Sequence, residues 1–147
     1  MRTAFASALL AAAVTCAVAP KATAQNQYMA QVDSQLARIK RTLGPRYSES
    51  REMIHARCSN ATPRNQNFNW DRASYVIAAA GDNDVTAIVL RLYDANNALV
   101  AADTSGSRTP RINVTVPATG TFYRLEMAIT GCNQYPCYLA LMPYRRQ

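Results

Sequence analysis

The sequence predicts a mainly β fold, an antiparallel β-sandwich preceded by one amphipathic helix. Apolar residues first recur every three or four positions between residues 27 and 43, and then alternate with polar residues to the end of the chain. Gly, Pro, Asn and Asp interrupt the alternating part at intervals of roughly 8 to 15 residues. Because no helical pattern lies between these segments, antiparallel sheets are favoured over a parallel sheet.

The composition is that of one globular domain. The chain has 147 residues, of which 49% are hydrophobic and 17% charged, and this excludes a wholly disordered protein. Five Gly and seven Pro exclude a collagen-like repeat. Sixteen Lys and Arg face nine Asp and Glu, so the formal net charge is +7.

Residues 1–24 have the features of a bacterial Sec-type signal peptide. Arg2 precedes the apolar, Ala-rich residues 4–19, and Ala22-Thr23-Ala24 forms a small-x-small cleavage site. Pro20 and Lys21 interrupt the apolar run before it reaches the length of a membrane span. We therefore predict a periplasmic or secreted protein that has no transmembrane segment after cleavage.

The second predicted segment, residues 25–45, is an amphipathic helix. Its apolar stripe consists of Met29, Val32, Leu36, Ile39 and Leu43, and Gly44-Pro45 ends it. The stripe docks either on the domain's own core or on a second copy of the chain. Leu36 and Ile39 are therefore candidate interaction residues, and a dimer through this helix is the second alternative.

Residues 46–147 form the predicted sandwich domain, with alternating apolar positions that mark short strands. The expected strands lie near residues 54–58, 68–70, 75–79, 88–93, 99–100, 112–116, 123–129 and 138–142. The polar residues 59–69 are the most loop-like part of this domain.

The segment from Tyr75 to Tyr138 resembles the bacterial pre-peptidase C-terminal domain. The matching elements are Gly81-Asp82-Asn83-Asp84, Ile88-Val89-Leu90-Arg91-Leu92-Tyr93-Asp94, Leu99-Val100-Ala101-Ala102-Asp103, Pro110, Gly120-Thr121-Phe122-Tyr123 and the stretch from Cys132 to Pro136-Cys137-Tyr138. They cover about half of the chain that follows the signal peptide. The resemblance implies a β-sandwich of jelly-roll type, which in that family accompanies secreted enzymes or stands alone as a non-catalytic module.

Some members of that family bind calcium through carboxylates that follow the Gly-Asp turn. Here that stretch reads Thr86-Ala87-Ile88-Val89 and has no carboxylate. The remaining calcium candidates are Asp82, Asp84, Asp94 and Asp103. Since Asp residues also cap turns through their own backbone, the turn interpretation is favoured and no cofactor is expected.

The cysteines indicate one disulfide. Cys132 and Cys137 flank a short turn-forming loop, and an oxidising compartment favours a bridge between them over a zinc site. Cys58 is then the odd thiol. It is either buried with Ile54 and Ala56 or joined to another chain, and burial is favoured.

No pattern indicates catalysis. His55 is the only histidine, and Gly-x-Ser-x-Gly, His-Glu-x-x-His and phosphate-loop motifs are absent from the sequence. Glu49, Glu52 and Glu126 have no cleft signature that would pair them as glycosidase carboxylates. We expect no catalytic residues and no enzyme; the alternative is a small secreted hydrolase or an accessory subunit of a secreted enzyme.

The expected partner follows from charge and exposure. A basic exported domain suits a protein or an anionic envelope component, such as a glycan or a lipid head group, and nucleic acid is not favoured. The arginines are scattered along the sequence, so a solvated surface is favoured over one dedicated patch. Most aromatic residues occupy strand positions, and only Tyr135, between the two bridging cysteines, is expected to be displayed. These features predict an exported non-catalytic binding or envelope-associated module.

Overall fold

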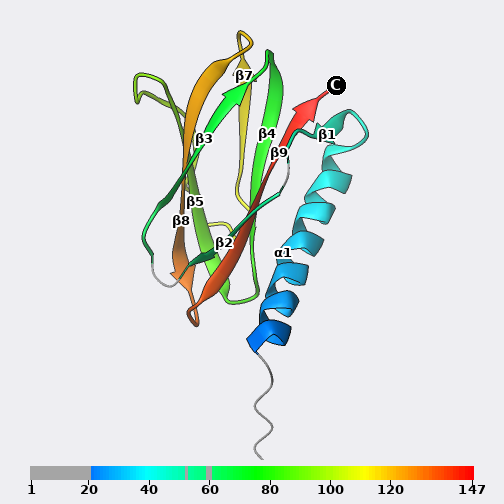
Figure 1. The fold of residues 1–147 in the computed structure, drawn as a ribbon, viewed down its shortest axis with the longest axis vertical. Coiled ribbons are helices and arrows are strands. Elements are labelled where there is room, and N and C mark those ends of the chain that lie inside the picture. Colours follow the sequence, from blue (N-terminus) through cyan, green and yellow to red (C-terminus); the bar gives the residue numbers. More distant parts are fainter. Residues whose placement is uncertain (1–20, 52, 59–60) are drawn as a thin grey trace, which may run out of the picture.

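The computed structural model describes residues 21–51, 53–58 and 61–147 and shows two antiparallel sheets packed face to face, with one helix on an outer face (Figure 1). Residues 1–20 of the predicted signal peptide lie outside the described residues. In the part of the chain that is described, no helix is both long and apolar enough to cross a membrane.

The elements follow one another in the order helix and then nine strands. They are α1 (Lys21–Leu43), β1 (Tyr47–Glu49), β2 (Ile54–Cys58), β3 (Arg64–Trp70), β4 (Ala73–Gly81), β5 (Val85–Asp94), β6 (Leu99–Asp103), β7 (Arg111–Val116), β8 (Thr121–Cys132) and β9 (Cys137–Arg146). The helix begins before the predicted start at residue 25, and it ends at the predicted glycine, because Gly44 has φ of 80° and its N–H donates to the Lys40 carbonyl.

The strand order is that of a jelly roll. One sheet, here called the covered sheet, has the order β1-β9-β4-β7, with β2 also paired to β9. The other, the open sheet, has the order β3-β8-β5-β6. The chain passes between sheets at most of its turns, so the predicted jelly-roll-like sandwich is confirmed.

The central strand β4 is apolar on both faces because it is covered on both sides. Tyr75, Ile77 and Ala79 point into the core between the sheets, whereas Val76 and Ala78 belong to the cluster beneath α1. Strands that are buried on both faces read as continuous apolar runs, and this explains the sequence of β4.

The helix packs on the covered sheet against β4 and β9 (Figure 1). Val32, Leu36 and Ile39 are buried, and the Tyr144 hydroxyl donates a 3.1 Å hydrogen bond to the Leu36 carbonyl. The apolar stripe therefore docks on the chain's own sandwich, which was the first of the two alternatives.

The expectation that residues 59–69 form a loop is wrong for its second half. Residues from Arg64 onward belong to β3, which pairs with β8 along its whole length. Phe68 and Trp70 point into the core, and Asn65, Asn67 and Asn69 alternate with them on the solvent side. The Asn and Gln residues of β3 are also common in loops, so the sequence alone did not indicate a strand. The pairing of β3 with β8 determines its extended conformation.

Candidate anion-binding groove

A groove lined mainly by polar and basic residues, whose carbon atoms form about half of its surface, runs between α1 and the segment that links β6 to β7. It consists of two hollows of about 380 and 410 Å³ that share Gln35, Arg38 and Arg108. The first is also lined by Ile39, Thr42, Ser107, Thr109 and Arg111, and the second by Gln27, Ala30, Gln31, Ser34 and Asn83. Because the hollows share lining residues, they lie end to end along the helix.

The helix wall of the groove is fixed to the sandwich by two amides. Gln35 Nε2 donates a 2.7 Å hydrogen bond to the Gly81 carbonyl, and Gln31 Oε1 accepts one of 3.0 Å from the Asn83 N–H. These bonds join α1 to the turn between β4 and β5. Arg38 is thus carried by a helix whose position relative to the sheets is held by hydrogen bonds as well as apolar packing.

The opposite wall is a loop whose backbone is also held in place. The carbonyls of Ser107, Arg108 and Pro110 accept hydrogen bonds from the N–H groups of Ile88, Gly81 and Ala79, at 2.9 to 3.1 Å. Arg108 and Arg111 therefore project from ordered backbone, and a ligand would meet two preformed walls.

The described lining of the groove has positive charge and no carboxylate, although the Asp103 carboxylate lies close by and accepts a hydrogen bond from the Arg111 N–H. Arg38, Arg108 and Arg111 come from α1, the linking loop and β7, and no Asp or Glu lines either hollow. Among the described residues, the ion pairs are Lys40–Glu49, His55–Asp33, Arg91–Glu126 and Arg145–Asp71, and none includes a groove arginine. Guanidinium groups bind phosphate, sulfate and carboxylate oxygens in a bidentate manner, so this arrangement suits an anionic ligand.

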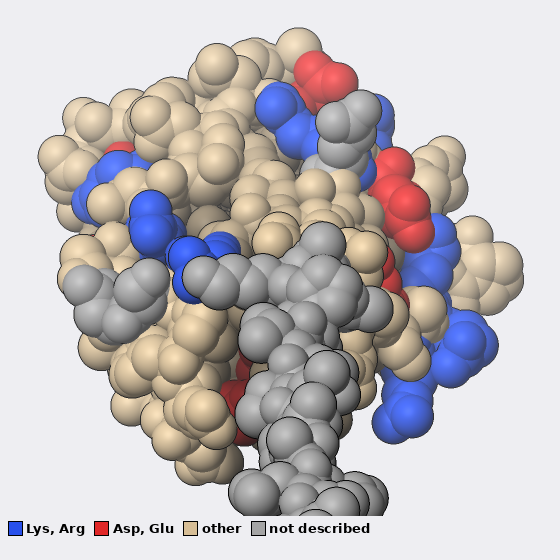
Figure 2. Space-filling model, turned by 60° about the horizontal axis from the view of Figure 1, so that its bottom comes forward, with Lys and Arg blue, Asp and Glu red and all other residues tan. Residues whose placement is uncertain are grey.

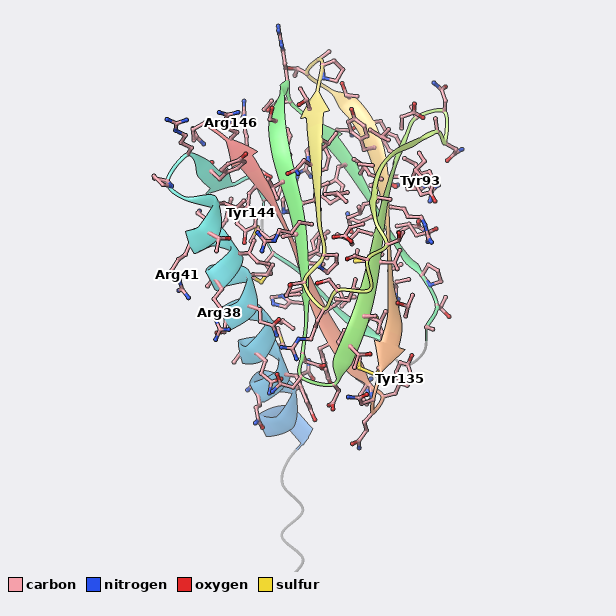
Figure 3. All side chains as sticks on the ribbon, turned by 180° about the vertical axis from the view of Figure 1, so that it is seen from behind. Arg38, Arg41, Tyr93, Tyr135, Tyr144 and Arg146 are labelled. Carbon is pink, nitrogen blue, oxygen red and sulfur yellow. A yellow bond between two sulfur atoms is a disulfide. The ribbon has the colours of Figure 1, made fainter. Side chains whose placement is uncertain are left out.

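Other basic residues are distributed differently. On the face shown in Figure 2, Lys and Arg lie in separate groups, and Asp and Glu lie near several of them. Arg41 projects from α1 one turn beyond Arg38 (Figure 3) and does not line the groove. The scattered surface expected from the sequence is therefore present, together with one local concentration of unpaired arginines.

The four calcium candidates do not converge on one site. Asp84 and Asp94 lie at opposite ends of β5, whose ten residues span about 30 Å. Asp94 Oδ1 accepts hydrogen bonds from the N–H groups of Asn96 and Ala98. No group of three metal-ligating side chains occurs within the described ranges. Asp94 therefore caps the turn after β5. Asp82 and Asp103 also accept hydrogen bonds from turn backbone.

Asp82 and Asp103 are structural carboxylates. Asp82 is fully buried and accepts backbone hydrogen bonds from Asp84, Val85 and Tyr138; its burial raises the pKa of this carboxyl despite those bonds. Partial burial acts in the same direction on Asp103, but hydrogen bonds from Ser105 and Arg111 outweigh it and lower the pKa. Both carboxylates stabilise turns by accepting hydrogen bonds from backbone N–H groups.

The predicted disulfide joins Cys132 to Cys137, and Cys58 is a buried free thiol, so both cysteine expectations are confirmed. Desolvation by burial raises the pKa of the Cys58 thiol, although Arg64 acts in the opposite direction. In the pairing of β2 with β9, Cys58 lies directly opposite Cys137. The three cysteines therefore meet at one corner of the core.

His55 has a partner that sequence reasoning missed. Its Nε2 lies 2.8 Å from Asp33 Oδ1 on α1, beside a hollow of about 190 Å³. Among the described residues no Ser, Thr or Cys lines this hollow, and Tyr138 supplies its one hydroxyl group. Glu49 pairs with Lys40 and Glu126 with Arg91, whereas Glu52 lies outside the described residues.

The candidate interaction residues fall into two groups. Leu36 and Ile39 are only 1% and 4% exposed, so their side chains mainly contact the chain's own covered sheet, and Ile39 also borders the groove. Tyr135 is 42% exposed at the tip of the loop after β8, as expected (Figure 3).

No sequence signal marks the groove in advance. Its arginines are separated by up to 73 positions and join only when α1, the β6–β7 loop and β7 meet. No protein-family model matches this chain, and no curated protein matches its sequence.

Proposed function

We propose that this protein is an exported, non-catalytic binding module of the cell envelope, and that its ligand carries anionic groups held in the groove beside α1. The single observation that supports this most strongly is that Arg38, Arg108 and Arg111 line one groove with no carboxylate among the lining residues. The signal-peptide pattern of residues 1–24 and the disulfide agree with export.

The groove suits binding better than catalysis. Its polar lining consists of guanidinium, amide and hydroxyl groups, none of which is a strong base at neutral pH. The candidate for a hydrolase is the His55–Asp33 pair, whose adjoining hollow is lined largely by Met29, Val32, Ala56 and Leu139. We therefore keep the hydrolase as the weaker alternative.

The test compares two triple variants of equal net charge on a dextran sulfate column. Arg38→Gln/Arg108→Gln/Arg111→Gln removes the groove charges, whereas Arg41→Gln/Arg72→Gln/Arg146→Gln removes three exposed arginines outside the groove. We expect the groove variant to elute at clearly lower salt than the control variant, because clustered guanidinium groups bind sulfate more strongly than dispersed ones. Circular dichroism checks that both variants are folded. Equal elution of the two variants would show that net charge, and not the groove, causes retention.

A further inference from the structure

The groove is longer than a single anionic group requires. Its lining residues on α1 run from Gln27 to Thr42. At 1.5 Å per residue this stretch is about 22 Å long. A phosphate or carboxylate would contact one short part of it, so the shape suits an extended ligand that lies along the helix.

The uncharged polar side chains of the groove offer partners for hydroxyl groups. Gln27, Ser34 and Thr109 supply an amide and hydroxyls, and Gln31, Gln35, Thr42 and Ser107 add polar atoms that also make hydrogen bonds within the protein. Among the described residues no aromatic side chain lines either hollow, and Ala30 and Ile39 are the apolar residues there, although carbon atoms of the other side chains make about half of the lining surface apolar. Single-stranded nucleic acids are bound largely by stacking on aromatic rings, and lipid chains need apolar surface. Sugar hydroxyls, which both donate and accept hydrogen bonds, match this lining better.

The charges are unevenly placed along the groove. Arg38 and Arg108 lie where the two hollows meet, and Arg111 lies at the Thr42 end, with its Nη1 donating a 3.4 Å hydrogen bond to Thr42 Oγ1. The other end, around Gln27 and Ser34, is polar and has no charged lining residue beyond the shared arginines. A bound chain would therefore meet cations over one part of its length and neutral hydrogen-bonding groups over the rest.

From this arrangement we propose that the groove binds a linear acidic polysaccharide, with acid groups on the arginines and hydroxyls toward Gln27. This ligand class rests on the anion binding proposed above. It adds two properties that anion binding alone does not have, which are a dependence on ligand length and a contribution from the uncharged end.

The experiment measures binding of oligogalacturonides of defined length to the purified protein by calorimetry at low salt. We expect the hexamer to bind more tightly than the dimer by about tenfold or more, because additional sugars reach the uncharged end. Affinity for both oligomers should fall as salt is added.

Variants separate the two ends of the groove. Gln27→Ala combined with Ser34→Ala should weaken hexamer binding severalfold and leave dimer binding unchanged, whereas Arg38→Gln should weaken both. Asn26→Ala and Arg41→Gln are matched controls, since both residues are exposed on α1 but do not line the groove. The controls should bind both oligomers as the wild type does.

The outcomes distinguish this proposal from the broader one. Equal affinity for dimer and hexamer, with dextran sulfate retention still dependent on the groove arginines, would overturn the polysaccharide and leave anion binding in place. Loss of that dependence would overturn both. Tighter binding of a single-stranded oligonucleotide of equal charge than of the hexamer would also overturn the polysaccharide, in favour of nucleic acid.

Discussion

At the scale of single residues, carboxylates that a sequence offers as metal ligands serve here as turn caps. Asp82 accepts backbone hydrogen bonds from its own turn and from Tyr138, so one side chain joins the β4–β5 turn to the start of β9. Asp103 likewise joins the end of β6 to the first residue of β7. The sequence offered a metal-ligand role and a turn-capping role for these residues, and these hydrogen bonds are those of turn caps.

Asp103 leads to a pH-dependent prediction. Its pKa is lowered from 3.8 in the folded protein. The ionised carboxylate therefore stabilises the folded state fully above pH 3.8, the pKa of the unfolded state. This contribution is lost as the pH falls through the lower pKa of the folded state. We expect Asp103→Asn to reduce the free energy of unfolding by about 1–2 kcal/mol at neutral pH, and this difference from wild type should shrink in acid.

Urea unfolding at neutral pH and near pH 3 measures this difference. Asp71→Asn is the control, because Asp71 is exposed and, among the described residues, its one ion pair is a 3.8 Å contact with Arg145. A deficit for Asp103→Asn that stays constant or grows in acid would show that the carboxylate is not what stabilises this turn.

The cysteine corner gives a second prediction at this scale. Directly opposite residues in an antiparallel pair have Cα atoms about 4.5–5.5 Å apart, within the range that a disulfide spans. In Cys132→Ser, we therefore expect oxidised glutathione to drive formation of a Cys58–Cys137 bond. In Cys137→Ser, Cys58 and Cys132 should remain thiols. Non-reducing peptide mapping distinguishes these results, and equal crosslinking in both variants would contradict the observed strand register.

At the scale of elements, the sequence predicted the helix and the strands whose apolar residues recur with a regular spacing over a few neighbouring positions. The helix stripe and the alternation in β5, β7 and β8 are visible over a few residues, and all of these elements are present. The first half of β3 was missed because its Asn and Gln residues also suit loops, and only pairing with β8 makes them a strand. Which surface the helix covers also could not be derived, because the stripe alone does not specify its partner.

Leu36 tests the docking of the helix. It is buried among Val76, Ala140 and other residues of the covered sheet. Leu36→Asp should therefore lower the free energy of unfolding by more than the ~2–5 kcal/mol typical of Leu→Ala, because it adds an unpaired buried charge. Thermal unfolding measures the effect. Ala37→Asp adds the same charge at the adjacent exposed position and should change little; similar melting temperatures for the two variants would mean that α1 is not docked.

At the scale of the whole molecule, the sandwich is asymmetric. Figure 1 shows α1 along one sheet only, and the groove exists only on that side, where helix, loop and β7 meet. The candidate site could not be predicted because it depends on this long-range arrangement. In the sequence, nothing distinguishes Arg38, Arg108 and Arg111 from the other scattered arginines. They line one groove only because of the jelly-roll topology and the position of α1.

The same topology predicts indifference to calcium. The four candidate aspartates are distributed among the β4–β5 turn, the far end of β5 and the end of β6, and three of them accept backbone hydrogen bonds. We expect neither millimolar calcium nor a chelator to change the melting temperature, since calcium needs six to eight converging oxygens. A rise of many degrees with calcium, measured by scanning calorimetry, would contradict this arrangement.

The small side chains beneath α1 set the width of the groove. Ala78, Ala80 and Ala140 are fully buried under the helix, and their methyl groups determine how closely α1 approaches the sheet. A larger residue at any of these positions would push the helix outward and move Arg38 away from Arg108 and Arg111. The spacing of the three groove arginines thus depends partly on three alanines that do not line the groove.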